Sequence, residues 1–177
     1  MKIRVVNKEN LFKIIILLGL FLPAIIQELV DLGQYKQIII GSIVNTCLFL
    51  CGIYEKDTKK IIAISTLPSV SVMLSGLLFS GLTFYSKLMI PFIWLGNLVI
   101  IYLSRLFYKQ NKFISYSFFS IILKVFIIYG GFKAVSMMFN FPKSVVNVMG
   151  NTMGIIQLFT ASIGFLITIF IIKKSKN

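Results

Sequence analysis

Long apolar runs alternate with short polar stretches along the whole of this chain. Six windows are each about as long as one bilayer crossing, which takes roughly 20 mostly apolar residues. They are approximately Leu11–Val30, Gln37–Tyr54, Lys60–Gly81, Ser86–Leu106, Phe113–Met138 and Ser144–Ile172. Because the connections are short, neighbouring helices have to be antiparallel and close together. The pattern predicts an all-α fold, a bundle of six transmembrane helices that forms one domain over residues 1–177.

The basic residues gather at alternate ends of these windows. Most of the 18 Lys and Arg form four clusters, Lys2/Arg4/Lys8/Lys13, Lys56/Lys59/Lys60, Arg105/Lys109/Lys112 and Lys173/Lys174/Lys176. The opposite ends hold only Lys36, Lys87, Lys133 and Lys143. Cytoplasmic segments of membrane proteins carry an excess of Lys and Arg. The pattern therefore predicts that both termini are cytoplasmic, and it explains the net charge of +13 without nucleic acid as a partner.

Composition narrows the class of protein further. Hydrophobic residues make up 58% of the chain and the mean hydropathy is +0.94, well above the soluble range. The frequent Ile, Lys and Asn fit an AT-rich bacterial genome, which suggests the bacterial cytoplasmic membrane. The basic N-terminus before an apolar window resembles a signal peptide, but no small-residue cleavage site follows it. We expect the first helix to be retained.

Chemistry that would indicate an enzyme is missing from the sequence. The chain has no His, no carboxylate pair within a span and no phosphate-binding loop. Cys47 and Cys51 are one turn apart on one apolar helix, a spacing that suits neither a disulfide nor, without His, a zinc site. We interpret both as packing residues, and we expect neither enzymatic activity nor a cofactor or metal.

Lys124 is the outstanding polar residue inside a predicted span. It lies about eleven residues into the window Phe113–Met138, which places it near the bilayer midplane. A lysine there costs about 2.5–3.5 kcal/mol on insertion scales, and no acidic residue lies deep in any span to pair with it. Ionisable residues in spans are functional candidates. The sequence leaves two interpretations open: an anionic ligand, or a lysine held by carbonyls and hydroxyls.

Other polar residues lie in the outer halves of the last three windows. Trp94 and Asn97 are three residues apart and share a helix face, and Tyr129 lies outward of Lys124. Asn147, Asn151 and Gln157 belong to the last window. Their convergence would form a polar, outward-facing pocket for a small molecule. A network of interhelical hydrogen bonds is the alternative. Gly150, Gly154, Ala161 and Gly164 follow helical spacing with Gln157 and predict close helix packing.

Three apolar motifs resemble a known family. They are Leu67-Pro68-Ser69 with Ser75-Gly76-Leu77, the run from Ile90 to Asn97 (IPFIWLGN), and the run from Met153 to Gly164 (MGIIQLFTASIG). In these segments the chain resembles the substrate-binding S components of energy-coupling-factor (ECF) transporters, vitamin and micronutrient importers of the ABC class. Six helices and cytoplasmic termini also fit this family.

The resemblance implies both a ligand and partners. It implies that helices 4 to 6 and the outer loops bind a vitamin or other micronutrient from outside. It also implies that a transmembrane coupling subunit and two cytoplasmic ATPase subunits drive release. Many members carry Ala-x-x-x-Ala on helix 1 for docking on the coupling subunit. Here the nearest equivalent is Gly19, Pro23 and Ala24, which departs from the pattern and leaves the register of the docking face open.

Two other classes of protein remain. A holin-like or channel-forming oligomer would need a polar stripe across the whole bilayer, whereas the polar residues here lie mostly in the outer half and at the midplane. An accessory membrane subunit without a ligand would use the same residues only for packing.

Overall fold

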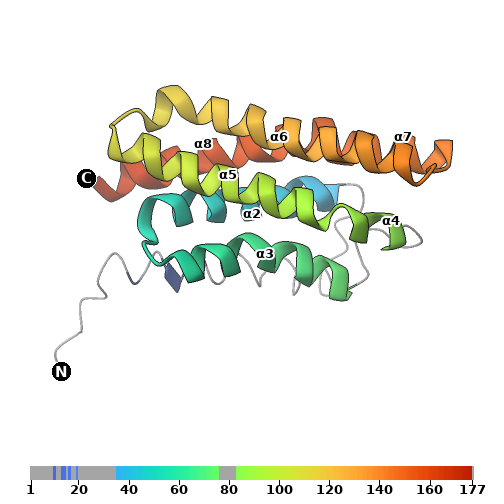
Figure 1. The fold of residues 1–177 in the computed structure, drawn as a ribbon. Coiled ribbons are helices and arrows are strands. Elements are labelled where there is room, and N and C mark those ends of the chain that lie inside the picture. Colours follow the sequence, from blue (N-terminus) through green and yellow to red (C-terminus); the bar gives the residue numbers. More distant parts are fainter. Residues whose placement is uncertain are drawn as a thin grey trace.

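The computed structural model describes residues 10, 13–14, 16, 19, 35–75 and 83–176. Within these residues the chain forms helices joined by short connections, and no strand occurs. In chain order the helices are α2 (Lys36–Tyr54), α3 (Thr58–Ser75), α4 (Thr83–Leu88), α5 (Ile90–Lys109), α6 (Phe113–Met138), α7 (Lys143–Asn151), a π-helical turn (Thr152–Ile156) and α8 (Gln157–Lys176) (Figure 1). The predicted all-α class is confirmed.

Four helical segments of the described part are long and apolar enough to cross a bilayer. They are Gln37–Tyr54, Ile90–Lys109, Phe113–Met138 and Lys143–Lys174. The chain is therefore a membrane protein with several spanning helices. Of the two other predicted windows, Leu11–Val30 lies mostly outside the described residues, and Lys60–Gly81 is described only as far as Ser75. The count of six spans stays a prediction.

The predicted helix Ser86–Leu106 is in fact two helices, α4 and α5, with a turn at Met89. Pro91 explains the break. A proline has no N–H to donate, and its ring collides with the carbonyl four residues earlier, here that of Lys87. The first turn of a helix tolerates proline because its N–H groups have no partner within the helix. Helix α5 accordingly begins at Ile90, and α4 remains a separate short helix.

Two asparagines end the long helices and reverse the chain. Asn111 and Asn140 have φ of 57° and 47°, the left-handed conformation that asparagine adopts more readily than most residues. After α5, the N–H of Lys112 donates to the carbonyl of Phe107 at 2.8 Å, a bond that closes a Schellman motif. The same motif follows α6. These tight turns place α5 beside α6, and α6 beside α7.

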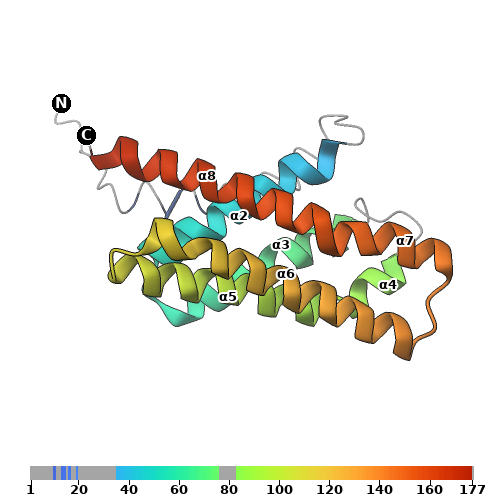
Figure 2. The ribbon, with the colours of Figure 1, turned by 90° about the horizontal axis from the view of Figure 1, so that it is seen from above.

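The most extensive helix pairs are α5 with α6 and α2 with α8, and two views of the bundle show them side by side (Figures 1 and 2). The α2–α3 and α5–α6 connections and the C-terminus of α8 lie at one end of the bundle, the left end in Figure 1. We call it the basic end, because these segments carry Lys56, Lys59, Lys60, Arg105, Lys109, Lys112, Lys173 and Lys174. Helices α4 and α7 lie at the opposite end.

Aromatic packing fills the half of the bundle near the basic end. Phe49 of α2, Phe113 of α6 and Phe165 of α8 have ring centroids 5.6–6.1 Å apart. Phe49 is fully buried, as are Leu48 and Leu50 beside it. This half of the described bundle is an apolar core, and the polar interior described below lies beyond it.

Gly130 and Gly131 make a matched pair that tests the α5–α6 packing. A methyl group on Gly131 would overlap the ring of Phe92, whereas one on Gly130 would meet no atom within 4 Å. We expect Gly131→Ala to lower the free energy of unfolding by about 1–3 kcal/mol, the usual cost of overpacking. Gly130→Ala should leave stability unchanged or slightly raised. Denaturant titration of both variants in detergent, followed by circular dichroism, measures this. Equal stabilities would contradict the packing described for Phe92.

Candidate binding site

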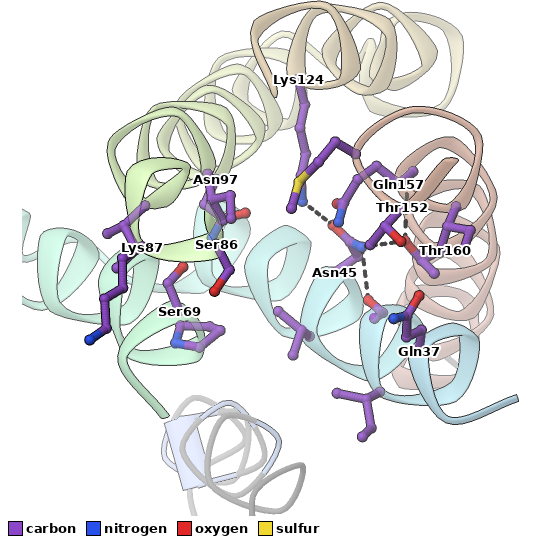
Figure 3. A pocket seen from close by; sticks show the side chains of 18 residues that line it. Gln37, Asn45, Ser69, Ser86, Lys87, Asn97, Lys124, Thr152, Gln157 and Thr160 are labelled. Carbon is purple, nitrogen blue, oxygen red and sulfur yellow. Dashed lines mark hydrogen bonds between the residues drawn. The ribbon is translucent and has the colours of Figure 1, made fainter. Parts of the chain in front are cut away.

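A cavity of about 140 Å³, which we call the inner cavity, lies inside the bundle. Eighteen residues line it, contributed by α2, α3, α4, α5, α6, the π-helical turn and α8 (Figure 3). Most of the exposed wall is apolar, but ten of the lining residues have polar side chains: Gln37, Asn45, Ser69, Ser86, Lys87, Asn97, Lys124, Thr152, Gln157 and Thr160. So many polar side chains around one space are unusual within apolar helices, because a polar group without a partner is costly there.

Lys124 reaches into this cavity from α6. Its side chain is only 2% exposed, and its ammonium donates to Oδ1 of Asn45 on α2 at 2.6 Å. Figure 3 shows the side chain extended from α6 toward α2. An ammonium has three N–H donors, and among the described residues Asn45 is its only hydrogen-bond acceptor. Lys124 therefore keeps donors that a polar occupant of the cavity can use.

Hydrogen bonds on both sides fix the amide of Asn45. Its Nδ2 donates to the carbonyl of Gly41 at 2.8 Å and to the hydroxyl of Thr160 on α8 at 3.2 Å. The Thr160 hydroxyl in turn donates to the carbonyl of Gln157. With both amide protons engaged, Oδ1 is turned toward Lys124. A methyl on Gly41 would come within 2.8 Å of Thr160, so the glycine permits the close α2–α8 approach.

Asn97 and Ser69 complete the side of the cavity toward α3. Asn97 is 2% exposed, and its Nδ2 donates to the carbonyl of Ser65 at 3.0 Å. Its amide oxygen has no donor among the described residues. The hydroxyl of Ser69 is buried and likewise lacks a partner within the described part of the chain. Buried polar atoms are nearly always hydrogen-bonded, so the hydroxyl of Ser69 is available to an occupant of the cavity.

The wall formed by the last span contains the π-helical turn. The predicted window Ser144–Ile172 is interrupted at Thr152–Ile156, and Thr152, Met153 and Ile156 line the cavity there. A π-helical turn holds an extra residue and is frequent at functional sites. It divides the predicted small-residue face: a methyl group on Gly164 would meet Asn45 on α2, whereas one on Gly154 would meet Tyr129 on α6.

A second, wider groove of about 420 Å³ lies between α6 and the α7–α8 segment. Its polar lining residues are Tyr129, Lys133, Asn147 and Asn151. The structure therefore separates the predicted site residues. Asn97, Lys124 and Gln157 line the inner cavity, and Tyr129, Asn147 and Asn151 line the second groove. We had expected these residues to converge on a single pocket, whereas the structure places them along two spaces. The π-helical turn rotates the first part of the last span relative to the rest.

Trp94 lines neither space. It is half-buried on α5, and its Nε1 has no hydrogen-bond partner among the described residues. Sequence reasoning missed Asn45 and Thr160, the residues that orient Lys124. The signal for Asn45 was present, since asparagine is rare in an apolar span. Thr160 gave no such signal, because a hydroxyl often bonds a carbonyl of its own helix.

The predicted docking residues are described only in part. Gly19 is buried, and a methyl group on it would overlap the sulfur of Cys47 on α2. This residue therefore faces α2 inside the bundle. Pro23 and Ala24 lie outside the described residues. The register of a docking face on the first window stays a prediction.

Comparisons with known proteins identify no relative of this chain. No protein-family model matches it, and neither a curated protein nor a solved structure does so. Any assignment of function therefore has to depend on the geometry of the inner cavity.

The Lys124–Asn45 hydrogen bond predicts a specific stability coupling. Asn45→Leu removes the acceptor of the buried Lys124 ammonium. It should lower the free energy of unfolding by at least about 1–3 kcal/mol, the cost of leaving a buried polar group without a partner. Lys124→Met removes the ion and should leave stability unchanged or raised. In the double variant the loss caused by Asn45→Leu should shrink.

A double-mutant cycle in detergent measures this coupling. Thr46→Val is the matched control, because Thr46 bonds the carbonyls of Ser42 and Gly164 and not Lys124. Its effect should add to that of Lys124→Met. Additivity of the Asn45 and Lys124 substitutions would mean that the hydrogen bond contributes nothing to stability.

Proposed function

We propose that this protein is a membrane-embedded substrate-binding subunit, an S component of an ECF-type importer that captures a vitamin or other micronutrient in the inner cavity. The observation that supports the proposal is the buried ammonium of Lys124, which faces the inner cavity and has one hydrogen-bond acceptor among the described residues. A lysine placed only for packing would be expected to have its donors satisfied by the protein. An anionic group on the substrate, a carboxylate or phosphate, is its natural partner.

The size of the cavity restricts the substrate. Drug-sized ligands occupy pockets of about 300–1,000 Å³, whereas this cavity measures about 140 Å³. An apolar protein cavity of about 150 Å³ accommodates benzene. The proposed substrate is therefore about the size of one ring, with one anionic group toward Lys124. The amide oxygen of Asn97 and the hydroxyl of Ser69 suit a donor elsewhere on the molecule.

The distribution of charge supports capture from outside the cell. The cavity is lined by Gln37 near the start of α2 and by Ser86 and Lys87 of α4, all at the end of the bundle opposite the basic end. Under the positive-inside rule the basic end faces the cytoplasm, which places both termini there and opens the cavity outward. Six spans would complete this topology.

Partners are part of the same proposal. The chain has no nucleotide-binding motif, so active uptake would need a coupling transmembrane subunit and two ATPase subunits. Docking was predicted at Gly19, Pro23 and Ala24 of the first window. Because Gly19 faces Cys47, a coupling subunit would contact the opposite face of this segment.

A channel is less well supported than a binding protein. A pore formed by this chain would need polar residues along its whole length, and the aromatic cluster of Phe49, Phe113 and Phe165 occupies the half of the described bundle near the basic end. An accessory subunit without ligand would explain the fold, but not the spare donors of Lys124.

Substrate binding should depend on Lys124. Native mass spectrometry of protein purified from its host would identify a retained small molecule, and isothermal titration would then compare variants. Lys124→Met should weaken binding about ten- to a hundredfold, because a hydrogen bond to a charged group contributes about 1.5–3 kcal/mol. Lys143→Met is the control, since Lys143 is exposed and lines neither space. Unchanged affinity in Lys124→Met would contradict the proposal.

The topology is tested independently of the ligand. Reporter fusions at the C-terminus should be cytoplasmic, and fusions after Tyr35, which precedes α2, should be external. These outcomes follow from the accumulation of lysine and arginine at the basic end. An external C-terminus would reverse the direction in which the cavity opens and exclude capture from outside.

A further inference from the structure

The second groove is amphipathic along its length. On α6, its lining residues Val125, Tyr129 and Lys133 follow one another at four-residue intervals and form a single stripe. Eight residues of helix rise about 12 Å, so Val125 lies that much deeper than Lys133. The facing wall is formed by α7, the π-helical turn and α8, which lie beside α6 in Figure 2.

The shallow part of the groove is polar and cationic. The ammonium of Lys133 lies 5.5 Å from the centre of the Tyr129 ring. Asn147 and Asn151 are exposed, one helical turn apart on α7. Among the described residues, no side-chain hydrogen bond engages either amide, and none engages the ammonium. The described carboxylates, Glu55 and Asp57, lie at the basic end, so this charge has no counterion within the described part.

The deeper part of the groove is apolar. Val125 and Leu158 line it together with Ile155, which is 61% exposed. Gly150 and Gly154 have no side chains, and this keeps the floor between the two walls open. A methyl on Gly154 would lie 3.2 Å from the Tyr129 ring. The shallow part of the groove is cationic and rich in amides, and the deeper part, which we call the trough, is apolar. This combination suits a molecule with an anionic head and a hydrocarbon chain.

We infer that this groove binds an anionic phospholipid from the leaflet at the end opposite the basic end. The phosphate lies against Lys133 and the amides of Asn147 and Asn151, and one acyl chain follows Val125, Ile155 and Leu158. A soluble anion would not need the apolar trough. A zwitterionic lipid brings an ammonium that Lys133 repels. This inference does not depend on the proposed substrate of the inner cavity.

Native mass spectrometry of the full-length protein in mild detergent tests the lipid preference. Phosphatidylglycerol and phosphatidylcholine of equal chain length serve as probes, added in titration. The wild type should retain phosphatidylglycerol in preference. Lys133→Gln should lower the affinity for phosphatidylglycerol about fivefold, the effect of one lysine near a membrane surface. Lys143→Gln, which removes an exposed lysine at the same end of the bundle but outside the groove, should keep wild-type affinity.

Two further comparisons separate a lipid from other occupants. Glycerol phosphate, the soluble headgroup, should not displace phosphatidylglycerol; displacement would assign the groove to a soluble anion and overturn the inference. Gly150→Leu should fill the trough and reduce retention of both lipids, whereas Gly130→Leu, on the open face of α6, should not. Equal phosphatidylglycerol binding in wild type and Lys133→Gln, or an equal loss in Lys143→Gln, would also overturn it.

Discussion

The hydrogen bond between Lys124 and Asn45 is the interaction on which the polar interior of this protein depends. An ammonium inside an apolar bundle is stable only while acceptors surround it. Asn45 supplies one such acceptor, and its own amide protons are bonded to Gly41 and Thr160. The lysine on α6 is thereby joined through α2 to α8. These contacts fix one side of the cavity.

Hydropathy was sufficient to predict most of the helices. The windows Gln37–Tyr54 and Phe113–Met138 agree with α2 and α6 to within a residue, because apolar runs and tight turns define where a span begins and ends. Lys124 could be singled out for the same reason. The break at Met89 was also readable from the sequence, since Pro91 cannot continue a helix that starts before it.

The rotation of each helix about its axis was not predictable in this way. Helix α6 is apolar on nearly every side, so its sequence does not say which residues face inward. Asn45 lies 79 positions from Lys124, and only the packing of α2 against α6 and α8 brings the two together. From the sequence, the residues of the inner cavity and of the second groove consequently appeared as one site. In the structure they are two separate spaces with different lining residues.

The π-helical turn at Thr152–Ile156 has an evolutionary consequence. Such a turn differs from an α-helical path by a single residue, and one residue corresponds to about 100° of rotation. Deleting Gly154 would restore a continuous helix and carry Asn147 and Asn151 around the axis, away from Lys133. A homologue without the turn would align with this chain across a one-residue gap here. The relative placement of the inner cavity and the second groove thus depends on one residue.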